Sequence, residues 1–454
     1  MKHSRLIQVL AIIALSLLFI GCTGVGIYSV VAVTPKLQTG NLPDGLSAMS
    51  VVAPSSMTGA SGDYAFFSSG PGIWVRRVTA PVASKWTSIS MPIRSGSNPW
   101  DGVQSMAATD DRIYFALYDY DSENSSYTVG LFYVNAYTAS TSTLTFNQLE
   151  VWTSDSNGYK TLELFAPRNN RVFVNILQHD NTYNSLEIKD GEKGFTSSQL
   201  FRLANTATAW TAATEITSAS LNGPTDGRYV TGVADNGAGT VRISATAFRA
   251  STDKGVLLDG NGNLVSVKGA TALPALNAVT WLPNVRGGAG DTGSTGAFIV
   301  AATALSGSTY PVYVSTDGST WYTVGGTTTS VLVTGFADIS TASAAQTDSA
   351  RTVLVATSSY IDGTKKYKAP LGYFELNTAP ALTADNNWSL TTAWKSFKFA
   401  DINTYGASKL KSSSILGMTV VGNDLYAVTR SKGVWKAPNI QGGSAVARPV
   451  WAPE

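Results

Sequence analysis

The sequence predicts an all-β fold, a β-propeller of seven four-stranded antiparallel blades that follows a signal peptide and a flexible tether. The first observation is a short phrase, an apolar residue followed by an aromatic or large apolar one, usually just after a glycine. Its seven copies are Gly72-Ile73-Trp74, Gly130-Leu131-Phe132, Gln199-Leu200-Phe201, Gly255-Val256-Leu257, Pro311-Val312-Tyr313, Gly372-Tyr373-Phe374 and Gly433-Val434-Trp435. Their last positions lie 56 to 69 residues apart. A strand-like repeat of that size is typical of propeller blades.

The second observation is a tryptophan that follows six of the seven copies, 8 to 20 residues later. These are Trp86, Trp152, Trp210, Trp321, Trp388 and Trp451. The fourth copy has Leu257 as its large residue and no tryptophan after it. The repeats place the blades at about residues 46–90, 101–154, 160–217, 227–268, 277–325, 330–392 and 411–452.

The third observation is the alternation of strands and turns, with almost no helical periodicity. Blade two shows it most clearly, with strands predicted at residues 103–109, 112–118, 130–135 and 149–153. Its second strand, like the corresponding one in other blades, is rich in small, aromatic and β-branched residues. That composition is expected for inner strands that are covered on both faces.

The N-terminus has the features of an export signal. Lys2 and Arg5 precede an apolar run over residues 6–20, which is short for a membrane span and suits a signal-peptide core. The run ends in Gly21-Cys22, and Cys22 is the only cysteine of the chain. We expect residues 1–21 to be a signal peptide, residues 22–45 a tether, and residues 46–454 the propeller.

The segment before Cys22 resembles a bacterial lipobox, although Phe19 and Ile20 depart from the usual pattern. The resemblance implies cleavage before Cys22 and a thiol that carries diacylglycerol, with palmitate as a further acyl group. It also implies a lipoprotein of the bacterial cell envelope, at the outer membrane or cell surface rather than the inner membrane. The alternative is an ordinary secretory signal with a chance cysteine.

Composition narrows the class of partner. Loss of residues 1–21 removes Lys2 and Arg5 and leaves 30 basic and 30 acidic residues. A neutral chain lacks the clustered basic excess of a nucleic-acid-binding protein. With one cysteine, the domain forms no internal disulfide. We expect a monomer whose partners are envelope proteins or glycans.

Blade five contains a recognisable turn sequence. Residues 312–323 resemble an Asp-box, the hairpin that joins the third and fourth blade strands in sialidase-like propellers, shortened here by one residue. The matching residues are Ser315, Asp317, Gly318 and Trp321. The resemblance implies a structural role: Asp317 would bind turn amides, Gly318 would permit a positive φ, and Trp321 would pack between blades.

Several motifs point to chemistry and are better explained structurally. Residues 288–293 match G-x-G-x-x-G, but the next element is a strand where a dinucleotide site needs a helix, so we expect no nucleotide. His179 is the only histidine outside the signal, and we expect a solvated histidine at a strand end. Residues 91–94 do not reproduce the sialidase signature.

A metal site is suggested by alternating acids. Asp119, Asp121 and Glu123 could supply oxygen ligands to Ca²⁺, but no glycine provides the sharp turn of a dedicated calcium loop. A solvated hairpin tip explains the acids equally well. We otherwise expect no cofactor.

The long polar loops between the second and third strands of blades two, three and six favour a ligand-binding face. The candidate ligand-binding residues are Tyr118, Tyr120, Tyr127, His179, Tyr183, Tyr360 and Tyr367. The alternative is that they are surface loops without a ligand. We predict a non-enzymatic protein- or glycan-binding module. The alternative functions are a sialidase-like, glycan-active hydrolase and an envelope-assembly scaffold.

Overall fold

The computed structural model describes residues 48–453 with gaps. The gaps are residues 53–63, 70–71, 78–86, 110–111, 125, 136, 139–142, 156–157, 169–170, 180–194, 217–220, 222–227, 248–253, 272, 275, 287–294, 303–310, 327–335, 337–350, 357–358, 363–364, 369–371, 378–381, 391–394, 397, 400–414, 422–423, 430–433 and 438–449. The predicted signal peptide and tether, with Cys22, lie outside the described residues, as does Tyr183.

The described chain is nearly all β, with one 3₁₀ turn, η2 (Trp210–Ala212). Among the described residues, no helix is long and apolar enough to cross a membrane. The all-β prediction is therefore confirmed for this part of the chain.

The sheets of the N-terminal half follow the order of the sequence. The first sheet contains β1 (Ala48–Val52), β2 (Tyr64–Ser69), β3 (Gly72–Arg77) and β4 (Thr87–Ile89). The second has the order β12 (Asn147–Thr153), β9 (Ser126–Val134), β8 (Ile113–Asp121) and β7 (Gly102–Ala108). The third contains β13 (Tyr159–Arg168), β14 (Arg171–His179), β15 (Phe195–Ala204) and β16 (Thr214–Glu215). Two small hairpins lie outside these sheets: β5 (Ile93–Ser95) with β6 (Asn98–Pro99), and β10 (Tyr137–Thr138) with β11 (Thr143–Leu144).

The sheets of the C-terminal half continue the pattern. The fourth contains β17 (Arg228–Asp235), β18 (Val241–Ala247), β19 (Lys254–Asp259) and β20 (Leu264–Val265), with β21 (Leu273–Pro274) also on β19. The fifth contains β22 (Leu276–Arg286), β23 (Thr295–Ala302), β24 (Val312–Ser315) and β25 (Tyr322–Thr323). The next contains β26 (Arg351–Ala356), β29 (Gly372–Asn377) and β30 (Ser389–Leu390), with β31 (Lys395–Ser396) on β29 and a separate hairpin of β27 (Ser359–Asp362) and β28 (Lys365–Lys368). The last contains β32 (Lys398–Phe399), β36 (Val450–Pro453), β35 (Val434–Ala437), β34 (Asp424–Thr429) and β33 (Ile415–Val421).

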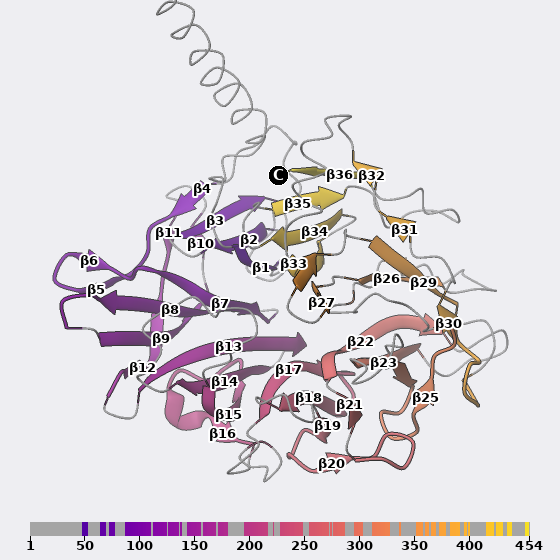
Figure 1. Cartoon of the computed structure of the whole chain (residues 1–454). Coiled ribbons are helices and arrows are strands. Elements are labelled where there is room, and N and C mark those ends of the chain that lie inside the picture. Colours follow the sequence, from indigo (N-terminus) through magenta and orange to yellow (C-terminus); the bar gives the residue numbers. More distant parts are fainter. Residues whose placement is uncertain are drawn as a thin grey trace, which may run out of the picture.

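The first strands of successive sheets contact one another. β1 contacts β7, β7 contacts β13, β13 contacts β17, and β17 contacts β22. At the other end of the chain β33 contacts β1, which brings the last sheet beside the first (Figure 1). Antiparallel sheets that meet through their first strands around a ring form a β-propeller.

The core lies between neighbouring sheets. The cluster between the second and third sheets contains Tyr114 and Leu131 from one and Leu162 and Val174 from the other. The side chains on the two faces of a sheet are buried only by the sheets on either side of it. Each sheet therefore depends on its two neighbours. The middle strands reflect this packing: in β14, residues 172–177 and His179 are buried.

The glycine of the repeated phrase has a steric reason. A Cβ on Gly72 would lie 2.9 Å from the ring of Trp74, and a Cβ on Gly130 would lie 2.6 Å from the ring of Phe132. The aromatic ring two positions later therefore occupies the space above the glycine. Both rings are buried.

The tryptophans that follow the repeats are not equally buried. Trp321 and Trp388 are buried, whereas Trp152 and Trp210 are half-buried and meet edge to face with ring centroids 5.2 Å apart. Trp321 packs with Leu257 and Leu273 of the preceding sheet, as predicted for a ring between blades.

Two predicted loops are hairpin strands instead. β8 and β9 continue to the pairs Tyr118↔Val129, Tyr120↔Tyr127 and Asp121↔Ser126, so the long polar loop expected in blade two is wrong. In the same way Tyr360 pairs with Tyr367 in the β27–β28 hairpin. Aromatic and β-branched residues placed opposite each other stabilise such extensions, even among polar neighbours. The loop predicted in blade three runs from His179 to Ser198. Its residues 180–194 lie outside the described residues, and its ends belong to β14 and β15.

Candidate functional site: a cleft between two hairpins

A polar cleft of about 1030 Å³ lies between the β5–β6 hairpin and the outer end of the β8–β9 hairpin. It is lined by Ser90, Met91, Arg94, Ser95, Asn98, Pro99, Trp100, Asp101, Asp119, Tyr120, Asp121, Ser122 and Glu123. We call it the hairpin cleft. One wall comes from the connection between the first and second sheets, and the other from the turn between the middle strands of the second sheet. This is the side of the sheet on which we predicted the ligand-binding face.

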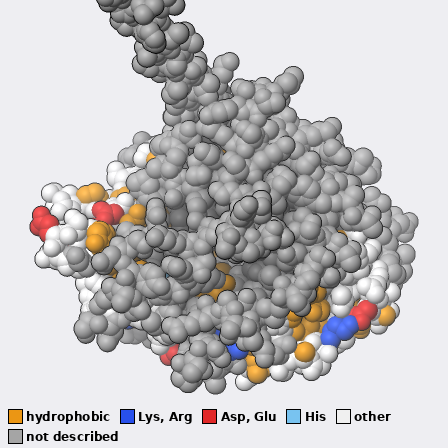
Figure 2. All heavy atoms as spheres, in the orientation of Figure 1, with side chains coloured by type: hydrophobic (Ala, Val, Ile, Leu, Met, Phe, Trp, Pro, Cys, Tyr) orange, Lys and Arg blue, Asp and Glu red, His pale blue; other side chains and the backbone are white. Residues whose placement is uncertain are grey.

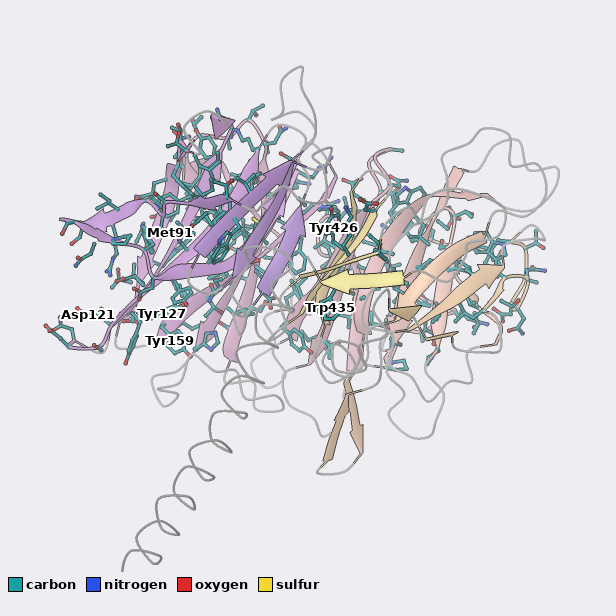
Figure 3. All side chains as sticks on the ribbon, turned by 90° about the horizontal axis from the view of Figure 1, so that it is seen from above. Met91, Asp121, Tyr127, Tyr159, Tyr426 and Trp435 are labelled. Atoms are coloured by element: carbon teal, nitrogen blue, oxygen red, sulfur yellow. The ribbon has the colours of Figure 1, made fainter. Side chains whose placement is uncertain are left out.

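The hairpin cleft lies at the edge of the molecule. Figure 1 shows β5 and β6 beside the ends of β8 and β9, at the left of the view. Figure 2 shows acidic and apolar side chains together at this edge. In Figure 3, Asp121 is at the tip of its hairpin, with Tyr127 and Tyr159 further in.

The β5–β6 wall is anchored by Trp100. Its indole is 3% exposed and meets the ring of Phe132 edge-on, with centroids 5.4 Å apart. The N–H of Trp100 donates to the carbonyl of Pro92 at 3.1 Å, and the N–H of Asp101 donates to the carbonyl of Tyr118 at 3.0 Å. The hairpin is therefore tied both to the core and to the opposite wall.

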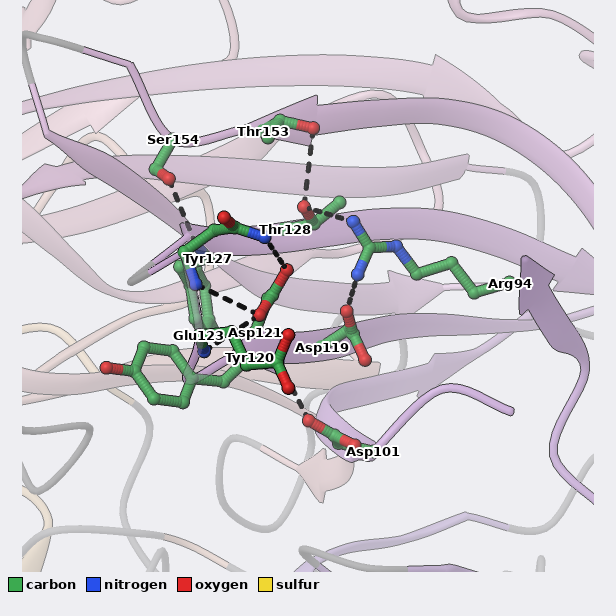
Figure 4. A network of polar contacts seen from close by, with 11 residues as sticks. Arg94, Asp101, Asp119, Tyr120, Asp121, Glu123, Tyr127, Thr128, Thr153 and Ser154 are labelled. Carbon is green, nitrogen blue, oxygen red and sulfur yellow. Dashed lines mark hydrogen bonds and ion pairs between the residues drawn. The ribbon is translucent and has the colours of Figure 1, made fainter. Parts of the chain in front are cut away.

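Arg94 joins the two walls (Figure 4). Its guanidinium forms an ion pair with Asp119 and donates to Oγ1 of Thr128 at 2.9 Å. It also lies 5.8 Å from the ring centroid of Trp100. The guanidinium of Arg94 therefore forms contacts with other residues of the cleft wall.

The other carboxylates of the cleft accept backbone hydrogen bonds. Asp101 Oδ2 accepts from the N–H of Tyr120 at 2.8 Å. Asp121 Oδ1 accepts from the N–H groups of Glu123 and Asn124 at 3.0 and 3.2 Å, and its Oδ2 accepts from Asn124 Nδ2 at 2.7 Å. The side-chain and backbone hydrogen bonds of Asn124 hold the pKa of Asp121 below its ordinary value, so this group is a carboxylate at neutral pH.

Two of the three residues predicted as calcium ligands already have partners within the protein. Asp119 pairs with Arg94, and Asp121 accepts a hydrogen bond within its own turn. In the described part of the chain, no group of three or more His, Cys, Asp or Glu side chains is arranged to hold a metal ion.

Two of the predicted ligand-binding residues are buried, so their expected exposure is wrong. Tyr127 is 4% exposed, stacks with Tyr118 at 6.1 Å between centroids, and accepts a hydrogen bond from Gln104 Nε2 at 3.0 Å. His179 is 3% exposed and stacks on Tyr159 at 4.5 Å. Tyr127 lies in the core between the second and third sheets, and His179 packs on the neighbouring strand β13, contacts that the sequence pattern of one strand does not reveal.

Burial also affects the protonation and hydrogen bonding of these side chains. Burial raises the pKa values of Tyr118 and Tyr127, so both phenols stay protonated at neutral pH. His179 Nε2 lies 2.8 Å from Thr161 Oγ1, within hydrogen-bond distance. We expected His179 to be solvated, but it is buried and packs against Tyr159.

Tyr120 is the candidate that lines the hairpin cleft with an exposed ring, at 39% exposure. Tyr360 and Tyr367 lie opposite each other in the separate β27–β28 hairpin. Trp100, Asp101 and Arg94 were not predicted as site residues, because residues 91–100 fell between two predicted blades and Asp101 stood at the start of the second one.

The turn at Asp317 is a structural element. Asp317 Oδ1 accepts from the N–H groups of Ser319 and Thr320, both at 2.7 Å, and from Ser315 Oγ at 2.9 Å. Gly318 has a φ of 77°, and its carbonyl accepts from Arg242 Nε at 2.8 Å. Partial burial raises the pKa of Asp317, but the hydrogen bonds from Thr320, Ser319 and Ser315 outweigh it and lower the pKa overall.

Comparison with known proteins adds little to this geometry. No protein-family model matches the chain, and no curated protein matches it. Among solved structures, the extracellular domains of Drosophila Semaphorin 1a match with a TM-score of 0.40 at 10% identity, covering 89% of this chain and 88% of that one. The polysaccharide lyase Uly1 matches with a TM-score of 0.39 at 12% identity, covering 90% and 89%. The six-bladed Aleuria aurantia lectin matches with a TM-score of 0.33 at 12% identity, covering 78% and 98%. Similarities this distant transfer neither activity nor ligand to this chain.

Proposed function

We propose that this chain is a lipid-anchored propeller of the bacterial cell envelope that binds glycans in the hairpin cleft without chemical turnover. The observation that carries the proposal is the cleft itself. It is large, it is lined mostly by polar side chains, and it presents the exposed ring of Tyr120. Ligand sites combine such a concave surface with a few placed polar groups.

The lining suits hydroxylated rings. Carboxylates such as Asp101 and Glu123 accept hydrogen bonds from hydroxyl groups, while Ser90 and Asn98 both donate and accept. The face of Tyr120 offers an apolar surface for the C–H face of a sugar. The buried Trp100 beneath the β5–β6 hairpin keeps the wall in place when the ligand is absent.

Binding without hydrolysis is supported by the state of the carboxylates. A glycosidase needs a carboxylic acid whose pKa is raised, so that it can donate a proton. The pKa of Asp121 is lowered instead, and Asp119 is paired with Arg94. The carboxylates of Asp121 and Asp119 therefore stabilise the shape of the cleft.

The seven-bladed architecture and the Asp-box relationship of residues 312–323 belong to the same proposal. They are supported by the seven repeats of the sequence and by the hydrogen bonds around Asp317. The repeat spacing leaves room for one blade between residues 330 and 392, where β26, β29 and β30 pair.

The lipid anchor is tested at Cys22. We expect Cys22→Ser to release the protein from the membrane fraction or leave it as an unprocessed precursor, because the thiol is the lipidated atom. Fractionation with detergent partitioning measures this. A Ser variant that still partitions into detergent at mature length would remove the anchor from the proposal.

The binding site is tested at Tyr120. We expect the full-length chain in detergent to bind members of a glycan array, and Tyr120→Ala to weaken that binding about tenfold, the loss of about 1.4 kcal/mol of stacking. Leu264→Ala is the matched control, since Leu264 is 48% exposed and lies outside the cleft. Equal binding by Tyr120→Ala and the parent would place the site elsewhere.

A further inference from the structure

We propose that the hairpin cleft selects glycans that carry free amino groups and disfavours glycans that carry carboxylates. The inference rests on the proposed glycan-binding function and adds the charge of the ligand. It follows from which charged groups line the cleft and which of them are already paired.

The lining is strongly acidic. Four of its residues carry carboxylates, Asp101, Asp119, Asp121 and Glu123, and one carries a positive charge, Arg94. A concave surface with one predominant sign of charge concentrates ligands of the opposite sign. The excess of carboxylates persists after Arg94 has neutralised Asp119.

Arg94 is not placed to receive an anion. Its guanidinium pairs with Asp119 and donates to Thr128, and Thr128 Oγ1 lies 3.3 Å from Thr153 Oγ1. A uronic or sialic acid at Arg94 would therefore lie beside the carboxylate of Asp119, which repels it. No other cation is among the described residues that line the cleft.

The unpaired side of the lining suits an ammonium group. Glu123 is exposed at the turn, and Asp101 is exposed and uses Oδ2 for the N–H of Tyr120. An ammonium group has three donors, and hydrogen bonds between two charged groups are stronger than neutral ones. The face of Tyr120 also attracts cations.

We assign the ammonium group to a sugar rather than to a lysine side chain. The cleft is broad, and its uncharged polar groups, Ser90, Ser95, Asn98 and Ser122, match ring hydroxyls around the amine. A peptide would offer few hydroxyl groups to these partners.

Calorimetry on the full-length chain in neutral detergent tests the proposal. The probes are a glucosamine hexamer at a pH where its amines are protonated, its N-acetylated counterpart, a galacturonate hexamer and a hexalysine peptide. We expect the glucosamine hexamer to bind about tenfold or more tightly than the N-acetylated one, with affinity falling as salt rises. The galacturonate should not bind.

The variant Asp101→Asn with Glu123→Gln should remove the preference for the amine while keeping the melting temperature. Glu215→Gln, an exposed acid on β16, is the matched control and should change nothing. Asparagine and glutamine retain the shape and an acceptor oxygen at both positions.

The possible results distinguish the preference for amines from glycan binding itself. Equal affinity for both glucosamine hexamers, or tighter binding of galacturonate, overturns the charge selection and leaves glycan binding in place. Binding of hexalysine alone overturns glycan binding in favour of a peptide ligand. Absence of binding by every probe overturns both.

Discussion

The β24–β25 connection and the tip of the β8–β9 hairpin each contain an aspartate that accepts hydrogen bonds from the backbone N–H groups two and three residues later. For Asp317 these are Ser319 and Thr320, and for Asp121 they are Glu123 and Asn124. The first turn is fixed to the core on one side: Gly318 is buried and contacts Arg242, and Trp321 behind it is buried between two sheets, while Asp317, Ser319 and Thr320 are exposed. The second turn lines the hairpin cleft. The same local hydrogen bonding therefore occurs in a turn held by the core and in a turn at the edge of a cleft, and what packs behind the turn distinguishes them.

The largest effect in this comparison is expected at Trp321. Trp321→Ala should destabilise the fold by about 3–5 kcal/mol, because the ring fills the space between the fourth and fifth sheets. Thermal or urea unfolding measures it. The half-buried Trp210 serves as the reference, and Trp210→Ala should cost clearly less. A Trp321→Ala protein that melts like the parent would mean that the ring is not part of the core.

A smaller loss is expected at Asp317. Asp317→Ala should cost about 1 kcal/mol, because the N–H groups of Ser319 and Thr320 lose their acceptor in a turn that holds the buried Gly318 and Trp321 in place. Asp121→Ala should lower the melting temperature less, since no buried residue of its turn depends on it. If the two variants are equally destabilised, the packing behind the turn is not what distinguishes them.

The pH dependence of stability sharpens the same contrast. The folded-state pKa of Asp317 lies below its ordinary value near 3.8, so its contribution is present above the unfolded pKa and is lost as the pH falls through the folded pKa. The difference in unfolding free energy between the parent and Asp317→Asn should therefore be constant near neutrality and shrink below about pH 4. Urea unfolding at several pH values measures this. A difference that grows on acidification would mean that the carboxylate is not favoured by the fold.

The smallest effect on stability is expected at Arg94. Arg94→Met should cost less than about 1 kcal/mol, since the ion pair with Asp119 is partly exposed. Its consequence for the cleft should be larger, because the β5–β6 hairpin loses its link to Thr128. Ligand affinity measured beside the melting temperature separates the two. A large drop in melting temperature would assign Arg94 to the core.

The sequence predicted the elements that repeat. The aromatic phrase, the buried middle strands and the hydrogen bonds of Asp317 all follow from local patterns that recur or that have a stereochemical requirement. The glycine that usually opens the phrase was noticed without its reason, which at Gly72 and Gly130 is the ring of Trp74 or Phe132 lying over it. These contacts join residues two positions apart in the chain, so a local sequence pattern can reveal them.

The candidate site was predicted only in part. Tyr120 was named from the sequence and lines the cleft, but Tyr127 and His179 were assigned to the surface although both are buried. The cleft wall at Trp100 and Asp101 comes from the connection between the first two sheets, outside the repeated phrase. Its contacts with β8 cross between separate segments, as in the hydrogen bond from Asp101 to Tyr118, and no local pattern encodes them.

The central claim is that the Asp121 turn at the hairpin cleft belongs to a binding site and that the Asp317 turn, held to the core through Gly318 and Trp321, belongs to the fold. The most direct test measures glycan affinity and melting temperature together for two variants, Asp101→Asn with Glu123→Gln in the cleft and Asp317→Asn in the turn held to the core. We predict that the cleft variant loses affinity at an unchanged melting temperature, and that Asp317→Asn loses melting temperature at unchanged affinity below it. Loss of affinity in Asp317→Asn, with the cleft variant binding like the parent, would contradict the account.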